Sequence, residues 1–293
     1  MVSRIGLFVA LFAIPVGLLA QKPNPAPGGW LIPQFDKPPI TDANRKPAPR
    51  RSLAGTWGPA GGNSAATQGG GVAARPNNGR AEQLPYTPYG LDAYRSHKAL
   101  EGADAVLPAD GNDPRNLCEP LGVPRYNHYN VRMTQIMQDE YKVAILYHYD
   151  NRWRVIWTDG RQLPTLVEGG VDLGGGDIRE PRFFGYSVGR WVDDYTFEVT
   201  TIGTMPEDRV WLDSTGRPIS DQVRVTETFR RMDYDTMVWS ETIDDPKMYT
   251  KPWETMRFQL RLHDPRTDIQ EYYCSPVEQE RYNRLFGNTV SGK

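Results

Sequence analysis

Three charged side chains lie on strand faces that are otherwise apolar, and they are the main candidates for ligand binding or catalysis in this chain. Glu227 shares its face with Val225 and Phe229. Arg190 lies on a face of tyrosine and valine, and Asp159 ends a face rich in tryptophan. Because a buried charge is costly unless it is paired, we expect Glu227 and Arg190 to meet each other, or a ligand, inside the fold. A purely structural ion pair that plugs one end is the alternative.

Aromatic residues near these charges indicate a binding surface as well as a core. A barrel mouth lined by tryptophan and tyrosine would suit a flat or amphipathic small molecule. The candidate ligand-binding residues are therefore Glu227, Arg190, Asp159, Tyr186, Trp191, Trp157 and His148. An interior carboxylate beside Tyr186 or His148 would also suit acid–base catalysis. We therefore leave open whether the protein is an enzyme and name no catalytic residue.

Other polar residues point to turns rather than to chemistry. Asp193-Asp194 and Asp244-Asp245 are vicinal carboxylates, and neighbouring residues of a strand point to opposite faces, which favours a role in turns. The four histidines, His97, His128, His148 and His263, lack the spacing of metal ligands. The glycine-rich stretch between Gly169 and Gly185 has no helix after it, as a phosphate-binding loop requires, and we expect a loop at the rim of a sheet. We predict no metal site and no cofactor.

A β-sheet must position these candidate residues. Short segments rich in β-branched and aromatic residues follow one another at hairpin spacing, with the alternation of a half-buried strand. The predicted strands are Arg132–Gln138, Lys142–Tyr149, Arg152–Thr158, Tyr186–Val192, Tyr195–Ile202, Gln222–Met232, Thr236–Ile243, Met256–His263 and Ile269–Cys274. No helices intervene, which excludes a parallel α/β sheet. The predicted fold is an all-β, antiparallel up-and-down barrel of about eight to nine strands, lipocalin-like in form. A β-sandwich is the alternative.

Two helices flank the predicted barrel. Thr87 followed by proline is typical of a helix N-terminus, and Gly102 closes this first helix. A second helix begins at Ser275, where Glu278 completes a capping box, and runs to Phe286. The chain therefore has a short helix before the barrel and a C-terminal helix after it.

The segment before the barrel differs in composition from the rest. Residues 1–20 combine Arg4 with an apolar run and a final alanine, as secretory signal peptides do, with a membrane anchor as the alternative. Residues 21–84 are dominated by Pro, Gly, Ala and Asn and are expected to form a flexible arm. Within this arm, Leu53–Trp57 indicates either a short strand or a tryptophan docked on the domain. Residues 85–293 are expected to form a single barrel domain.

The net charge and the cysteine content limit the possible partners of the protein and indicate its cellular compartment. The net charge of −2 is weak and unclustered, so nucleic acid and an anionic membrane surface are excluded as partners. We expect export to the periplasm or the exterior, with no stable membrane insertion of the mature chain. In that oxidising compartment the two cysteines, Cys118 and Cys274, are expected to form a disulfide, with two free buried thiols as the alternative.

Several segments together resemble one family. They are TPYGLDAY, NDPRNLCEPLGVPR, WTDGRQLP, GYSVGRWVDDYTFEVTT, WLDSTGRPISDQVRVTETFRRMD, TIDDPKMYTKPW and EYYC. Over residues 85–275 the chain resembles a large family of secreted bacterial proteins without an established function. The resemblance implies export and a single β-rich, lipocalin-like domain, and it implies no reaction. Members often carry His where Tyr186 stands and an acidic residue where His148 stands, so a site built from those positions would be altered here.

Three function hypotheses follow from these observations. The first is an exported β-barrel that binds a small apolar or amphipathic molecule in a continuous interior cavity, with Glu227 or Arg190 reaching into it. The second is a secreted hydrolase or lyase that uses interior carboxylates. The third is a structural or interaction protein of the cell envelope, which a filled barrel without a cavity would favour.

Overall fold

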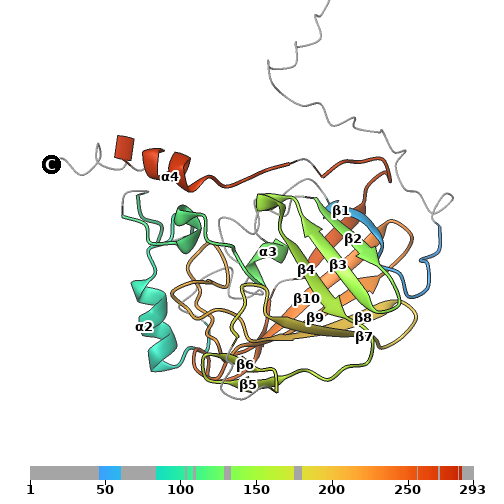
Figure 1. Ribbon diagram of the computed structural model, residues 1–293, viewed down its shortest axis with the longest axis horizontal. Coiled ribbons are helices and arrows are strands. Elements are labelled where there is room, and N and C mark those ends of the chain that lie inside the picture. The colour runs from blue at the N-terminus through green and yellow to red at the C-terminus, as the bar shows by residue number, and fades with distance from the viewer. Residues whose placement is uncertain are drawn as a thin grey trace, which may run out of the picture.

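The computed structural model describes residues 46–60, 84–102, 104–107, 110–128, 133–174, 180–255, 257–269, 271–282 and 284–285 (Figure 1). Nine of the described strands form a closed barrel, because β9 pairs with both β8 and β10. These strands are β1 (Gly55–Pro59), β2 (Thr134–Gln138), β3 (Lys142–Tyr147), β4 (Trp153–Trp157), β7 (Tyr186–Trp191), β8 (Thr196–Ile202), β9 (Arg224–Arg231), β10 (Thr236–Asp244) and β12 (Phe258–Leu262). The predicted all-β barrel is therefore confirmed.

The barrel is mixed rather than purely antiparallel. Its strands follow the order β10-β12-β1-β2-β3-β4-β7-β8-β9 and return to β10, and every pair is antiparallel except β4 and β7. The connection from β4 to β7 contains a small hairpin of β5 (Thr165–Val167) and β6 (Gly170–Asp172), where the sequence predicted only a loop. A connection of this length lets the chain return to the end from which β4 began, and parallel pairing requires such a return.

The first strand of the barrel lies inside the stretch predicted as an arm. β1 pairs with β2 on one side and with β12 on the other, so it closes the wall between them. Trp57 is buried in the core, and its indole N–H donates to the carbonyl oxygen of Leu53 over 2.9 Å. Residues 46–60 thus belong to the folded barrel. The predicted signal peptide (1–20) and the remaining arm residues 21–45 and 61–83 lie outside the described residues.

Alternate residues of each strand fill the barrel. β9 and β10 show this clearly, because every second residue along them is buried and the residues between are half-buried or exposed. The inward-pointing core includes Trp57, Ile136, Val143, Ile145, Ile156, Phe197, Val199, Phe229, Met237 and Trp239. A short strand, β11 (Trp253–Glu254), extends the sheet beside β10. Large side chains on every wall therefore occupy the space that an open barrel would leave for a ligand.

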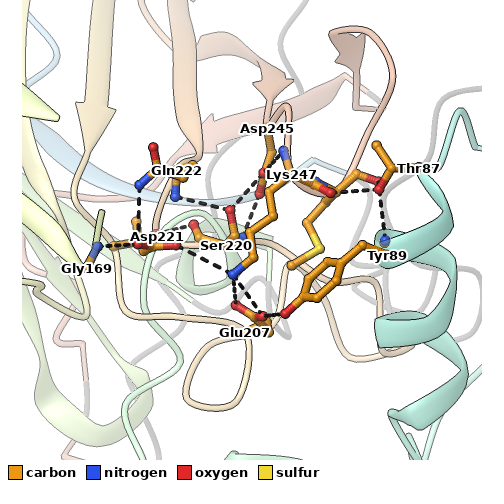
Figure 2. Close-up of polar contacts among 12 residues, drawn as sticks. Thr87, Tyr89, Gly169, Glu207, Ser220, Asp221, Gln222, Asp245 and Lys247 are labelled. Carbon is orange, nitrogen blue, oxygen red and sulfur yellow. Dashed lines mark hydrogen bonds and ion pairs between the residues drawn. The ribbon is translucent and has the colours of Figure 1, made fainter. Parts of the chain in front are cut away.

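A polar network fastens helix α2 (Pro88–Ser96) to the loop after β10 (Figure 2). Thr87 caps the helix, as predicted: its hydroxyl accepts from the backbone N–H of Gly90 over 2.9 Å and donates to the carbonyl oxygen of Lys247 over 2.7 Å. The ammonium of Lys247 lies 3.2 Å from a carboxylate oxygen of Glu207, and the hydroxyl of Tyr89 donates to the same carboxylate. These contacts join three separate segments into one clamp.

The vicinal carboxylates act as turn formers, as predicted. Asp245 accepts the backbone N–H and the hydroxyl of Ser220 over 2.6 and 2.8 Å, beside the clamp (Figure 2). Asp193 accepts the backbone N–H groups of Tyr195 and Thr196 in the turn from β7 to β8, each over 2.7 Å. Both aspartates thus satisfy backbone donors that a turn leaves without a strand partner.

The C-terminal segment crosses the outside of the barrel toward helix α4 (Pro276–Tyr282) (Figure 1). The predicted strand Ile269–Cys274 is not formed in its described residues, because a closed barrel has no edge left for it to join. The segment is held instead by a disulfide between Cys118 and Cys274, as predicted. The backbone N–H of Cys274 also donates to Asp150 over 3.1 Å. We call residues 264–274 the strap.

Short helices complete the described structure. They are α3 (Arg125–His128), the 3-10 helix η2 (Pro114–Leu117), which places Cys118 for the disulfide, and the 3-10 helix η4 (Tyr149–Asn151), which joins β3 to β4. Among the described residues, no helix has the length and apolar character needed to cross a bilayer.

Candidate functional site

A buried ion pair lies at the centre of the barrel. Arg154 of β4 and Glu227 of β9 are both almost fully buried, and the guanidinium donates to both carboxylate oxygens, with Nη1 to Oε1 at 3.0 Å. Arg154 also donates to the hydroxyls of Ser187 on β7 and Thr201 on β8, over 3.1 and 2.6 Å. Although burial opposes its charge, the carboxylate of Glu227 raises the pKa of Arg154 above its ordinary value. Arg154 is therefore charged, and its guanidinium donates to side chains of three other strands.

A second buried carboxyl adjoins the pair. Glu241 of β10 lies directly opposite Glu227 in the register of β9 and β10. The side-chain amide of Asn127 donates to both carboxyls, over 2.7 Å to Glu227 and 3.2 Å to Glu241, and the hydroxyl of Tyr147 donates to Asn127 over 2.7 Å. Burial, and after it the negative charge of Glu227, raise the pKa of Glu241 well above its usual range. Glu241 therefore retains its proton at a pH where an exposed glutamate has lost it.

The interior next to this cluster is filled. The void lined by Asn127, Tyr147, Trp57 and Trp239 measures about 30 Å³, which is room for a water molecule or two. The continuous interior cavity that the sequence suggested is not found in the described part of the barrel. The reason is packing: aromatic side chains from several walls and the polar cluster meet at the barrel axis. Glu227 is thus inside the barrel, as predicted, but it faces Arg154 rather than an open cavity.

An open cleft of about 610 Å³ lies over the junction of β4 and β7. This volume is in the range of small-molecule sites. Its lining residues are Pro120, Arg152, Trp153, Arg154, Val155, Trp157, Pro181, Arg182, Phe183, Phe184, Gly185, Tyr186, Ser187 and Met205. Because Arg154 and Ser187 are members of the buried cluster, the cleft reaches down to the edge of the barrel interior.

The parallel pairing of β4 and β7 creates this cleft. The two strands share only two register pairs, Ile156 with Ser187 and Trp157 with Val188, so the first residues of β4 have no register partner on β7. The loop at residues 181–185 lies at this gap. It is held by a hydrogen bond from Arg182 N–H to the carbonyl oxygen of Gly203, over 3.0 Å. Gly185 ends the loop at φ +60°, and a side chain there would meet the carbonyl oxygen of Ile202 at 2.6 Å.

The structure brings two of the predicted ligand-binding residues together at this cleft and links a third, Asp159, to its wall through Arg161. Trp157 and Tyr186 line the cleft. Asp159 lies in the turn after β4 and holds Arg161 with two guanidinium hydrogen bonds, 3.0 Å from Nε and 2.7 Å from Nη2. The guanidinium of Arg161 lies 3.6 Å from the ring centre of Trp157. Asp159 therefore contributes indirectly, by positioning a cation on an aromatic wall.

Three other predicted residues lie away from the cleft. Arg190 is on the outer face of β7, with a side chain that is 76% exposed, and it pairs with Glu198, so the expected pairing with Glu227 is wrong. Trp191 packs against Phe197 with ring centres 5.1 Å apart. His148 is buried where β3 meets η4, and its ring contacts Tyr272 of the strap edge-on at 6.4 Å.

Arg154 and Glu241 were missed by the sequence reasoning, although the sequence contains a signal for each. Trp153, Val155 and Trp157 looked like the buried face of β4, but the structure turns that face outward and puts Arg154 inside. For Glu241, the signal is its position in a hairpin whose turn is centred on Tyr234. Residues that lie the same number of positions before and after Tyr234 face each other across the hairpin, which pairs Glu241 with Glu227. Asn127, on the short helix α3, had no such periodic signal.

A second, smaller groove lies beneath the strap. It measures about 410 Å³ and is lined by outward-pointing residues of β2 to β4, including Met137, Leu146 and Trp153, together with Ile269 and Tyr273 of the strap. Arg152 and Trp153 line both the cleft and this groove, so they lie between the two spaces. The outer face of β4 thus carries an apolar surface on both sides of one exposed tryptophan.

Comparison of the chain with protein-family models, with curated proteins and with solved structures finds no significant match. Within the described residues, no three His, Cys, Asp or Glu side chains are grouped as metal ligands would be. Function must therefore be inferred from the geometry of the cleft and the cluster beneath it.

Proposed function

We propose that this protein is an exported β-barrel that binds a small amphipathic molecule in the cleft between β4 and β7. One observation carries the proposal: the cleft offers about 610 Å³ beside aromatic walls, whereas the interior void offers about 30 Å³. Apolar walls with a few fixed polar groups are the usual character of small-molecule sites. Here Arg154 and Ser187 supply fixed polar groups at the floor, and neither can shift without breaking the buried cluster.

Export is supported by the apolar N-terminal segment, by the motif resemblance and by the disulfide between Cys118 and Cys274. The mass of the mature protein, purified from outside the cytoplasm of its own cells, tests this part of the proposal. Cleavage near residue 20 is the expected result. Recovery of the full-length chain from the cytoplasm with two free thiols would contradict it.

Binding is favoured over chemistry at the interior carboxylates. Glu227 accepts hydrogen bonds from Arg154 and Asn127, and Glu241 is buried behind Asn127, which lines a space of only about 30 Å³. A substrate would have to displace a packed core residue to reach either carboxyl. The ion pair therefore serves to hold β4 and β9 together beneath the cleft, in agreement with the structural alternative considered from the sequence.

A fluorescent probe tests the binding proposal. N-phenyl-1-naphthylamine is flat, apolar and uncharged, and its emission rises when it leaves water. We expect saturable binding to the wild-type protein, and we expect the substitution Tyr186→Ala to weaken it by about threefold to tenfold, the value of one aromatic contact.

Tyr195 provides the matched control for this substitution. It is a partly exposed tyrosine in the turn just after β7, and it does not line the cleft. Tyr195→Ala is expected to leave the probe affinity unchanged. Equal losses in both variants, or no saturable binding to the wild type, would contradict a site at the cleft.

A further inference from the structure

We infer that the ligand of the cleft is an anion: an amphipathic molecule with a carboxylate, sulfonate or similar oxyanion head and an apolar body. This inference rests on the proposed function and adds the charge of the ligand to it. The observation behind it is the charge of the residues that line the cleft. All the charged lining residues are arginines, and their carboxylate partners Asp150, Glu180 and Glu227 are not part of the lining.

The lining itself has a single sign of charge. Arg152, Arg154 and Arg182 line the cleft, and none of the other lining residues is an aspartate or a glutamate. Arginine presents five N–H donors in a planar fork that matches two oxygens of an oxyanion, and it carries no acceptor. A cationic head would meet only like charges among the charged residues of this lining. A neutral molecule would gain nothing from their charge.

Arg182 and one further arginine, Arg161, lie against aromatic rings that line the cleft. The guanidinium of Arg182 lies 5.0 Å from the ring centre of Tyr186, and that of Arg161 lies 3.6 Å from the ring centre of Trp157. A guanidinium stacked on an aromatic face has restricted freedom, so less entropy is lost when it binds an oxyanion. The cleft thus places preorganised cations next to apolar surface, as an amphipathic acid requires.

The arginines differ in how freely they can exchange partners. Arg154 is buried and is held by Glu227, so it cannot leave its partner without exposing a buried charge. Arg182 pairs with Glu180, and both side chains are more than two-fifths exposed. Arg152 is exposed to a similar degree, but its partner Asp150 is buried, so Arg152 is held more firmly than Arg182. An exposed ion pair such as that of Arg182 with Glu180 stabilises little, so Arg182 can turn to a bound oxyanion.

A matched pair of probes isolates the charge. 1-Anilinonaphthalene-8-sulfonate has the same apolar body as N-phenyl-1-naphthylamine and adds one sulfonate. Dissociation constants for both are measured by fluorescence at low and high salt. At low salt we expect the sulfonate probe to bind about tenfold more tightly than the neutral probe, although the sulfonate must lose more of its hydration. We expect this difference in affinity to decrease at high salt, because salt screens the charge of the arginines.

Substitutions locate the effect. Arg182→Gln is expected to reduce the advantage of the sulfonate probe by about threefold or more and to change the affinity of the neutral probe little. Arg190→Gln is the matched control, because Arg190 is an exposed, ion-paired arginine of the adjacent strand that does not line the cleft. Arg152→Gln is a second test within the lining, and thermal unfolding confirms that each variant folds.

The outcomes separate the two proposals. If both probes bind with equal affinity, or if Arg190→Gln reduces the advantage as much as Arg182→Gln does, the inference about charge is wrong and the cleft remains a binding site. If neither probe binds, or if Tyr186→Ala has no effect on either probe, the proposed function itself is wrong.

Discussion

Arg154 and Glu227 show how a charge can be held at the centre of this barrel. The guanidinium of Arg154 donates to both carboxylate oxygens of Glu227. Its remaining N–H groups donate to Ser187 and Thr201, and Asn127 donates a further hydrogen bond to Glu227. Removing one partner of such a pair typically costs about 3–5 kcal/mol, because the other charge stays buried. The pair therefore fixes the distance between β4 and β9 beneath the cleft, and substitution of either residue alone is expected to destabilise the fold.

Glu241 makes the stability of the barrel depend on pH. Burial raises the pKa of Glu241 in the folded state, so folded molecules keep a proton that unfolded molecules release. The free energy of unfolding therefore falls as the pH rises above the pKa that Glu241 has in the unfolded chain. We expect Glu241→Gln to match the wild type near about pH 4.5 and to be more stable at about pH 8, with a difference growing by up to about 1.4 kcal/mol per pH unit. Urea unfolding at the two pH values measures this difference.

Glu198 provides the control for Glu241. It lies on β8 and pairs with the exposed Arg190, so Glu198→Gln is expected to change stability little and without this trend in pH. A difference between wild type and Glu241→Gln that is the same at both pH values would show that Glu241 does not retain its proton in the folded state.

At the scale of elements, the disulfide fixes the strap across the outside of the barrel. Cys118 follows η2 and Cys274 ends the strap, and 156 residues separate them in sequence. Next to the disulfide, Tyr272 of the strap packs against Tyr149 with ring centres 5.3 Å apart. The strap forms one wall of the smaller groove, so its position depends on this one covalent link and on a few contacts.

Opening the disulfide should destabilise the fold substantially. In the chain-entropy model a loop of this length contributes up to about 5 kcal/mol, and we expect the double substitution Cys118→Ser and Cys274→Ser to lower the urea midpoint accordingly. Reductant should lower the midpoint of the wild type in the same way and leave that of the double variant unchanged. A wild-type midpoint that does not respond to reductant, with the thiols shown to be free, would contradict this role.

Local patterns in the sequence predicted the elements well, for physical reasons. Thr87 caps α2 because a hydroxyl before proline can accept a first-turn N–H, and Asp193 forms the turn from β7 to β8 for a similar reason. The disulfide followed from two cysteines and an expected oxidising compartment. By contrast, the segment Ile269–Cys274, with isoleucine and two tyrosines, looks like a strand in isolation, and only the closure of the barrel shows that no edge is left for it.

At the scale of the whole molecule, barrel closure depends on contacts that local patterns do not contain. Alternation along a strand defines two faces, but it does not say which face points inward, and so the tryptophan face of β4 was placed in the core. β1 joins the wall from within a proline- and glycine-rich stretch, where composition alone predicts an arm. The cleft itself arises from the parallel pairing of β4 with β7, which depends on how a long connection returns.

Hydrogen exchange with and without N-phenyl-1-naphthylamine tests the location of the binding site most directly. If the molecule binds its ligand in the cleft, the probe should slow exchange in residues 153–157 and 181–187, nearly all of which line it, and leave the strap at residues 264–274 unchanged. Protection confined to the strap and to β2 and β3 would place the site in the smaller groove instead. No protection in any part of the chain, with the probe present well above the protein concentration, would contradict a binding function for the cleft.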